Sequence, residues 1–487
     1  MNAQRIEDLR CQQSGSVDIL YRTLGELPIV SGRPSKFRFS SMVLVLLSPY
    51  LVLRLGYVQN ILLAIVILDI PFQLGTHLLY RDADAVSGAL AGLSISATTI
   101  ALLGLYASWF IRTLEKRTPR SGKSTKVNWS LLCYLGFTAL SLVVARDIRL
   151  SGFELFLLLQ MYLVFLYVAN FVRTREEVLF VISFLLIGCL IESALMVALA
   201  FSNLASGLWG PVHFRVDPQA HGVLSRIGGT VGSPNEAGAY LSLVLSLAVS
   251  ILFSDSSRKY KWLAAGVIGF GSAALILTFS RGAWISFVAA IVLFYLSLWR
   301  RNRVSLKTPI VTVAILLISY LPFHNAVEGR LLADDNGSAE SRIPLMNLAF
   351  RIIADHPLLG VGSNNFSTAM DSYVTREFQT GFLYTVHNKY LLIWTEVGVL
   401  GLLAYLAFLF GVLRKGWMCW RFNDPLLSPL ALGFTAASVG YMVHQTVDIF
   451  HDRAVTQLLW LVAGLLVAMH GILRAQPADF DPFSSIT

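Results

Sequence analysis

Charged residues are scarce in this sequence. Asp, Glu, Lys and Arg together make up 14% of its 487 residues, whereas soluble domains carry about 25%. Hydrophobic residues make up 55%, and the mean hydropathy is +0.64. This deficit of charge extends over most of the chain, so it excludes a water-soluble fold unless the apolar stretches lie in lipid.

The sequence also lacks the alternating apolar and polar segments that a transmembrane β-barrel needs. Its apolar runs are continuous instead. A continuous apolar run in lipid must be helical, because hydrocarbon offers no hydrogen-bond partners to backbone N–H and C=O groups. The sequence therefore predicts an all-α integral membrane protein.

Cysteines and paired carboxylates give little support for metal chemistry. The four cysteines are far apart and form no CxxC pair: Cys11, Cys133, Cys189 and Cys419. Neither a zinc site nor a disulfide framework is indicated. None of the three polar clusters described below contains a DxD-like carboxylate pair, so we predict no metal and no other cofactor.

The net charge of +9 does not indicate nucleic-acid binding. The basic residues cluster in turns between apolar runs, as the positive-inside rule predicts for cytoplasmic loops. From residue 112 onward every second loop is basic, and we place these loops in the cytoplasm: 112–128, 173–175, 258–261, 300–307 and 414–421. Two longer connections, 203–236 and 324–386, then fall on the external side.

The apolar runs predict about twelve transmembrane helices with both termini inside. The clearest runs lie near 85–111, 129–146, 152–172, 177–202, 237–254, 262–279, 283–299, 308–323, 389–412, 429–447 and 455–473. Arg54 and Gly56 split the stretch 41–80 into two shorter runs, which form either two spans or one span plus a re-entrant piece, and the charge pattern favours a single crossing. The predicted organisation is a cytoplasmic arm (1–38), a transmembrane bundle (39–323) containing the external loop 203–236, a large external loop (324–386), C-terminal transmembrane helices (387–473) and a cytoplasmic tail (474–487).

Polar residues concentrate at three places on the predicted external side, where charge near lipid is costly and therefore a functional candidate. The first is the 203–236 connection, in which Arg215 and Arg226 precede a glycine-rich turn that ends at Asn235. Glycines permit close backbone approach, so exposed N–H groups beside Arg226 would cradle an anion. A surface loop with solvated charges is the alternative, and composition favours neither.

The other two places are tight turns. Arg281 lies between two apolar runs with almost no loop around it. A snorkelling arginine is the alternative, but an external arginine in so short a turn opposes the positive-inside bias, so we favour a functional role. The third place is His387-Asn388, where a lone histidine at a helix end is more often a capping residue than a catalyst. His444 and Asp448 form a weaker pair on one helix face, either structural or proton-handling.

Two arginines and one histidine at one membrane face suggest diphosphate chemistry. Guanidinium groups bind phosphate bidentately and keep their charge. A neutral imidazole accepts a proton from an attacking hydroxyl group. A diphosphate leaving group needs charge stabilisation more than protonation.

Four features of the sequence resemble the bacterial superfamily of O-antigen ligases and polymerases, which are membrane glycosyltransferases. They are Arg226 with the Gly-Ser-Pro-Asn turn, the Ser280-Arg281-Gly282 turn, the stretch Asp355–Phe366, and His387-Asn388 followed by nine residues and Gly398. The last feature is similar to the ligases' His-[Asn/Ser/Gln]-x9-Gly pattern. The four occur in order between residues 226 and 401, with a matching hydropathy profile on both sides.

The resemblance implies a GT-C-like, multi-pass enzyme of the bacterial inner membrane. Such enzymes pass a glycan from undecaprenyl pyrophosphate to an acceptor hydroxyl at the external face, without a nucleotide and, in the ligases, without a metal. The acceptor is a lipid A-core sugar for ligases and another lipid-linked repeat unit for polymerases. Membrane lipid, a flippase and a chain-length regulator are the other expected partners.

The resemblance also implies roles for individual residues. Arg226 and Arg281 would hold the diphosphate, Arg215 is a spare candidate for the first of them, and His387 would activate the acceptor. Supporting candidates are Asn235, Asn388, Glu396, His444 and Asp448.

Two departures from the ligase pattern favour a polymerase. Threonines follow the glycine in the ligases, whereas Val399-Leu400-Gly401 follows here. The segment Leu68–Gln73 also looks more like members that act on exopolysaccharide.

Two other classes of function remain open. A transporter or flippase of lipid-linked glycan is favoured by Asp69 and Glu192, two candidate intramembrane acids, although we find no inverted repeat. A structural subunit of an export complex would need 324–386 but would tolerate replacement of the candidate catalytic residues. We expect glycosyl transfer.

Overall fold

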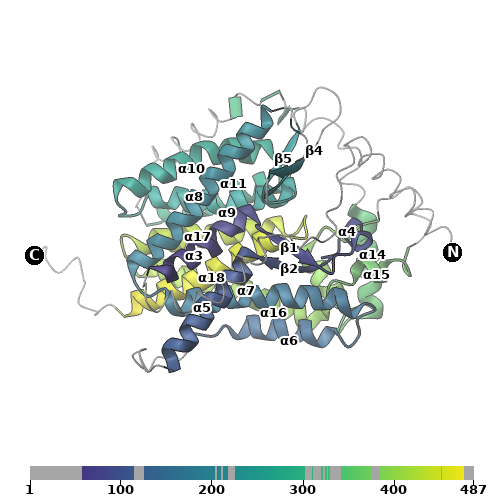
Figure 1. The fold of residues 1–487 in the computed structure, drawn as a ribbon. Coiled ribbons are helices and arrows are strands. Elements are labelled where there is room, and N and C mark those ends of the chain that lie inside the picture. Colours follow the sequence, from purple (N-terminus) through teal and green to yellow (C-terminus); the bar gives the residue numbers. More distant parts are fainter. Residues whose placement is uncertain are drawn as a thin grey trace, which may run out of the picture.

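The computed structural model describes residues 57–114, 126–202, 204, 206–209, 212–217, 225–301, 310, 320–321, 324–325, 327–328, 342–374, 383–450 and 452–475. Within these ranges the chain is a bundle of helices with small β-elements gathered at one end (Figure 1). The predicted N-terminal arm, the first part of 41–80, most of the run 308–323 and nearly all of the C-terminal tail lie outside the described residues.

Seven of the described helices are long and apolar enough to cross a membrane. They are α7 (Ile148–Phe171), α8 (Arg175–Ala200), α9 (Pro234–Leu252), α10 (Arg258–Leu277), α11 (Arg281–Trp299), α16 (Lys389–Arg421) and α18 (Arg453–Arg474). Beside them pack α3 (Val58–Phe72), α5 (Ala97–Leu114), α6 (Trp129–Ser141) and α17 (Leu427–His444). The predicted helical membrane architecture is confirmed for the described residues, and the count of twelve spans stays a prediction.

Successive helices alternate in direction, so the basic turns that the structure describes meet at one end of the bundle. There Arg175 pairs with Asp424, and the Asp255 N–H donates to the Pro425 oxygen at 2.9 Å. The opposite end, which we call the site end, holds the first turns of α7, α9, α11, α16 and α18. This separation of basic turns from the site end is what the positive-inside rule predicts.

Short polar side chains begin the helices that start at the site end. Ser233 and Glu236 form a capping box at α9, in which each side chain accepts a hydrogen bond from the other residue's N–H. Pro234 occupies the first helical position, where no N–H is needed. The side chains of Ser280 at α11 and Asn388 at α16 accept hydrogen bonds from backbone N–H groups of the first helical turn, without a capping box. Parts of the predicted motifs are therefore helix-start signals.

The apolar run 85–111 is helical over only part of its length. After the short helix α4 (Asp82–Val86), β2 (Leu93–Ser96) pairs antiparallel with β1 (Gly75–Leu78), and α5 begins at Ala97. Gly88 adopts a φ of +85°, which a continuing α-helix cannot contain. The run therefore forms a hairpin at the site end before α5 begins.

The described part of the 203–236 connection is a small antiparallel sheet. It contains β3 (Gly207–Trp209), β4 (Val212–Asp217) and β5 (Arg226–Gly229) in that order. Asp217 lies opposite Arg226 in the register of β4 and β5. This pairing brings the two arginine-bearing segments of the connection side by side.

The described part of the 324–386 connection contains the helices α14 (Arg342–Asp355) and α15 (Phe366–Met370). They form a small core of their own against the start of α16 and the end of α17. Its buried members include Leu345, Leu348, Phe366, Val386 and Ile449. The described part of this connection is therefore largely helical and packs on the segment that carries His387.

The two candidate intramembrane acids are paired inside the bundle. Asp69 forms an ion pair with Arg453 and accepts a hydrogen bond from Thr98 Oγ1 at 2.7 Å. Glu192 accepts a hydrogen bond from the Thr230 N–H at 2.7 Å, which ties the turn after β5 to α8. Both carboxylates are therefore engaged in holding segments of the bundle together, so they no longer favour the hypothesis of a transporter or flippase.

We predict that breaking the Arg453–Asp69 pair destabilises the bundle. In Asp69→Asn, Arg453 is only 5% exposed and loses its counter-charge. Removing one member of a buried pair costs about 3–5 kcal/mol. Thermal unfolding in detergent should show a clear fall in Tm, which the double variant Asp69→Asn/Arg453→Met should largely recover. Arg81→Ala, which breaks a more exposed pair with Asp147, is the control, and an equal fall there would contradict the prediction.

Candidate functional site

Arg226 connects two of the predicted motifs at the site end. Its Nε donates to the backbone oxygen of Thr278 at 3.1 Å, and its Nη2 donates to Asn235 Oδ1 at 2.8 Å. Thr278 ends α10 immediately before the turn that carries Arg281, and Asn235 lies in the first turn of α9. Three segments that are distant in sequence thus meet at one guanidinium group.

The turn that carries Arg281 is tightly built. Phe279 adopts a φ of +47°, and Ser280 Oγ accepts a hydrogen bond from the Ala283 N–H at 3.4 Å. Arg281 is partly buried at the first position of α11. A helix N-terminus attracts anions through its backbone N–H groups and its dipole. This turn therefore offers a cationic side chain and a helix end to a negatively charged group.

His444 lies against the same turn. A Cβ atom on Gly282 would come within 2.7 Å of His444 Nε2. The His444 side chain is 1% exposed, and its Nδ1 has no hydrogen-bond partner among the described residues. Asp448 and Arg342 both interact with it electrostatically. His444 is therefore placed beside the Arg281 turn, but the prediction that it shares a helix face with Asp448 is wrong, because α17 ends at His444 and Asp448 lies in the segment that follows.

His387 lies in the short segment 383–388 that leads into α16. Thr385 anchors this segment, because its N–H donates to the Ser87 oxygen and its Oγ1 to the Gly88 oxygen, both at 3.1 Å. The rings of Tyr384 and His387 are 5.3 Å apart between centroids. The hairpin region after α4 thus supports the histidine from one side.

The residues that follow α17 hold the start of α16, next to His387, from the other side. Asn388 Nδ2 donates to the Thr446 oxygen at 3.0 Å. The Lys389 N–H donates to the Gln445 and Asp448 oxygens at 2.9 and 3.1 Å. Since His444 contacts the arginine turn and its neighbours contact the histidine segment, the end of α17 connects the two parts of the site.

Carboxylates from three elements complete this end of the bundle. Glu236 in α9 hydrogen-bonds the side chain of Asp452 and interacts with Asp448. Tyr384 interacts with all three carboxylates. Burial raises the pKa of Tyr384, and Asp452 and Glu236 raise it further. The phenol therefore stays protonated at neutral pH and can donate a hydrogen bond to a ligand.

Arg215 reaches the same cluster from β4. Its Nε pairs with Asp217 Oδ1 at 2.8 Å, and its side chain is 52% exposed. It also interacts electrostatically with Glu236 and Tyr384. Beside it, burial and the Arg215 charge lower the pKa of His213, so that imidazole is neutral at pH 7. The spare arginine predicted from the sequence is thus close to the site end, on its more exposed side.

Helix α16 is broken at Gly398, and another predicted motif fills the break. Gly398 adopts a φ of +80° and a ψ of 179°. The Val361 and Gly362 N–H groups donate to the oxygens of Thr395 and Glu396 at 2.9 and 3.0 Å. On the other side of the break, the Val399 N–H donates to the Pro357 oxygen at 3.0 Å. The stretch Asp355–Phe366 thus replaces hydrogen bonds that the helix itself lacks.

The break gives the His-Asn-x9-Gly spacing a structural meaning. Asn388 caps the part of α16 that precedes the break, residues 389–397, which we call the upper segment, and Gly398 ends it. The Glu396 side chain accepts a hydrogen bond from the Phe366 N–H at 2.9 Å. This supporting candidate therefore helps to hold the stretch Asp355–Phe366 against the break in α16, an arrangement that we call the interlock. The spacing is the length of the short helical segment that carries His387 at its start.

The Ser363-Asn364-Asn365 part of the motif clamps this stretch to the rest of the bundle. Asn364 Oδ1 accepts from the Leu90 N–H at 2.8 Å, and Asn365 Oδ1 accepts from the Asp147 N–H at 2.7 Å. Ser363 Oγ donates to Glu154 at 2.5 Å. These buried side chains hold the stretch in position. The motif therefore shapes the candidate site and does not supply the groups that could react there.

The glycine-rich turn after β5 is also an anchor. The Thr230 N–H donates to Glu192, and the Ser233 N–H donates to Glu236 at 3.1 Å. These N–H groups are therefore engaged within the protein, and the anion-binding role predicted for this region rests on Arg226.

Metal ligation has little support in the described ranges. No group of three or more His, Cys, Asp or Glu side chains there is arranged to hold a metal ion. The sequence contains two Asp-x-Asp pairs outside the predicted clusters, Asp82/Asp84 and Asp479/Asp481, and the structure describes the first of them. Arg81 pairs with Asp84 at 2.7 Å and with Asp147 at 2.5 Å, which ties α4 to the start of α7.

Sequence reasoning missed four residues at the site end. Tyr384 and Lys389 lie on either side of His387-Asn388 in the sequence, and this position was the only feature that pointed to them as site residues. Arg342 opens α14, and a basic residue at the start of an apolar segment on the external side could have identified it. Asp452 precedes α18 at its N-cap position, where its residue type is a helix-start signal.

Residues 265–406 match the family model described as O-antigen ligase. The resemblance to the O-antigen ligase and polymerase superfamily is confirmed. The ligase-type region contains Arg281, the Asp355–Phe366 stretch, His387 and Gly398. It supports a membrane glycosyltransferase of the O-antigen ligase or polymerase type. No curated protein matches the chain.

We predict that Gly398→Ala disrupts the interlock of this ligase-type region. A Cβ atom there would lie 1.9 Å from the Leu358 oxygen, and the φ of +80° disfavours any side chain. The variant should be less stable and should lose protection of residues 355–366 in hydrogen exchange. Gly411→Ala in the same helix has nothing within 4 Å of its added Cβ and is the matched control. It should gain up to about 1 kcal/mol, because alanine is the better helix former. Equal behaviour of the two variants would contradict this account.

Proposed function

We propose that this protein is an O-antigen or exopolysaccharide polymerase or ligase. It transfers an undecaprenyl-pyrophosphate-linked glycan to an acceptor sugar hydroxyl at the external face of the bacterial inner membrane. The observation that carries the proposal is the convergence of Arg226, the Arg281 turn and the His387 segment at the end opposite the basic turns. The match of residues 265–406 to the O-antigen ligase family supports it.

The arginines bind the diphosphate of the donor. Arg281 adds its charge at the N-terminus of α11, and Asn235 orients Arg226 through the bond to Nη2. Arg215 on the more exposed side extends the cationic surface. Together these groups stabilise the negative charge that grows on the leaving diphosphate.

His387 accepts the proton of the acceptor hydroxyl. The hydroxyl oxygen attacks the anomeric carbon of the donor sugar, and the bond between that carbon and the diphosphate oxygen breaks. The diphosphate leaves with the electron pair, and the proton remains on the imidazole. Asn388 and Glu396 hold the segment that carries this histidine, while His444 and Asp448 connect it to the arginine turn.

The acceptor decides between the two activities. A polymerase adds the glycan to a second lipid-linked repeat unit, and a ligase adds it to a lipid A-core sugar. The sequence departures after Gly398 favour the polymerase. In either activity a flippase supplies the donor at the external face, and a chain-length regulator acts with a polymerase.

We predict that the purified protein, given a short undecaprenyl-pyrophosphate-linked repeat unit alone, forms a ladder of products on a gel. His387→Ala should abolish the ladder because the acceptor keeps its proton. His356→Ala is the matched control, since His356 is exposed in the neighbouring connection, and it should leave the ladder intact. A single shifted band that requires lipid A-core would assign a ligase instead. Normal elongation by His387→Ala would contradict glycosyl transfer through this site.

We also predict that Arg226→Ala and Arg281→Ala weaken donor binding. A charge-assisted hydrogen bond contributes about 1.5–3 kcal/mol, so the KM for the donor should rise about 10- to 100-fold. Arg149→Ala at the exposed start of α7 is the matched control, because it also removes a positive charge from the site end. A uniform rise in all three variants would assign the effect to general surface charge.

A further inference from the structure

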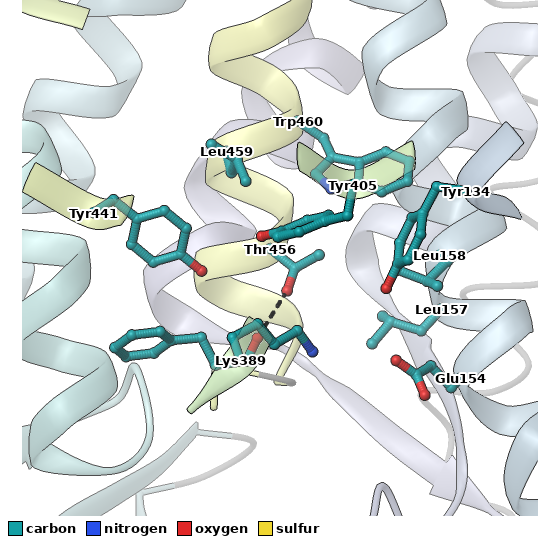
Figure 2. A pocket seen from close by; sticks show the side chains of 11 residues that line it. Tyr134, Glu154, Leu157, Leu158, Lys389, Tyr405, Tyr441, Thr456, Leu459 and Trp460 are labelled. Carbon is teal, nitrogen blue, oxygen red and sulfur yellow. Dashed lines mark hydrogen bonds between the residues drawn. The ribbon is translucent and has the colours of Figure 1, made fainter. Parts of the chain in front are cut away.

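A buried lysine follows the His387-Asn388 pair directly. The Lys389 side chain is 8% exposed, while its backbone N–H holds the end of α17. In Figure 2 its ammonium group and the carboxylate of Glu154 on α7 point into the same pocket. Glu154 is also buried, at 9% exposed. Charges at this depth are costly unless they are compensated, so the two groups are natural partners.

A small cavity of about 20 Å³ is lined by both side chains. Among the described residues no direct ion pair or hydrogen bond joins Lys389 to Glu154. The hydroxyl-bearing side chains of Tyr134, Tyr405 and Tyr441 also line the cavity (Figure 2). A buried water needs about 10–15 Å³ and a few polar partners. The cavity provides the volume and the partners for one water molecule.

Gln445 does not line the cavity, but it is hydrogen-bonded to Tyr405, which does. Its Nε2 donates to the Tyr405 hydroxyl at 2.6 Å. The side chain is completely buried, and its Oε1 has no hydrogen-bond partner among the described residues. Because the Tyr405 hydroxyl accepts the bond from Gln445, its own hydrogen is left for another acceptor, such as a water molecule in the cavity.

The upper segment of α16 needs a lateral support of this kind. The break at Gly398 interrupts its hydrogen bonding to the rest of the helix. The cap at Asn388 and the Asp355–Phe366 stretch hold its two ends. Glu154 is itself fixed by the hydrogen bond from Ser363. A contact from Lys389 to this fixed carboxylate would hold the segment against α7.

We propose that the cavity binds one water molecule that bridges Lys389 and Glu154, and that this bridge positions His387 opposite the arginine turn. Glu396, which is 6% exposed, interacts electrostatically with both groups from the same helical segment. Lys389 and Glu154 are positioning residues, because they act on the reaction through His387. The positioning role rests on the proposed function, whereas the bridge itself does not.

The bridge is tested by an experimental structure at a resolution that shows ordered water. A density peak within hydrogen-bond distance of Lys389 Nζ and a Glu154 carboxylate oxygen is the expected result. An empty cavity, or a direct contact between the two side chains, would overturn the proposal.

Its mechanical effect is tested by hydrogen exchange in the purified full-length protein. Lys389→Met/Glu154→Gln removes both charges together, so no uncompensated charge remains from this pair. We expect severalfold faster exchange of the amides in 383–397, with a Tm close to that of the wild type. Thr456→Val changes the wall of the same cavity from α18 and should leave this exchange unchanged. Equal exchange in the double variant and the wild type would overturn the supporting role of the pair.

Kinetics of glycosyl transfer test the positioning role. A small displacement of a catalytic group lowers kcat about 10- to 100-fold, and the double variant should show this fall with the donor KM unchanged. A kcat that stays at the wild-type value despite faster exchange would overturn the positioning role. If the wild-type protein shows no glycosyl transfer at all, the proposed function fails, while the density and the exchange data still decide the bridge.

Discussion

The site depends on a set of backbone hydrogen bonds that cross the break in α16. In a membrane interior a helix cannot end abruptly, because its free carbonyl and amide groups would lack partners. Here Val361, Gly362 and Pro357 supply those partners around Gly398. The neighbouring connection and the helix therefore form one unit, and the position of His387 follows from it. Without this interlock the upper segment would have neither its length nor its direction.

The polar residues of the bundle divide into anchors and reactive groups. Asp69, Glu192 and Glu396 accept hydrogen bonds from segments they hold in place. The arginines and His387 instead lie at or next to the ends of helices and strands at the site end. Hydrogen bonding of this kind explains how so apolar a chain contains Asp69, Glu192 and Glu396 as buried acids.

The helical membrane class could be predicted from the sequence, because apolar runs and basic turns follow directly from the properties of lipid. Arg281 was singled out by its unusual place in that pattern, whereas His387 was singled out by the family resemblance, and the roles of both stay predictions. The hairpin of β1 and β2 was missed, because β2 lies inside the apolar run 85–111, which reads as one span and is interrupted only by Gly88 and nearby small residues. Lys389 and Asp452 were missed for a different reason. Their importance arises from contacts between segments that are distant in sequence, and no local pattern reports such contacts.

The break at Gly398 also sets a rotational phase. Each residue of an α-helix turns the chain by about 100° and advances it by about 1.5 Å. Adding or removing one residue between Asn388 and Gly398 would swing the first turn of α16 around its axis while the interlock stayed in place. The start of α16 would then present a different side to the end of α17 and the Arg281 turn. The length of this segment therefore fixes the direction in which His387 points.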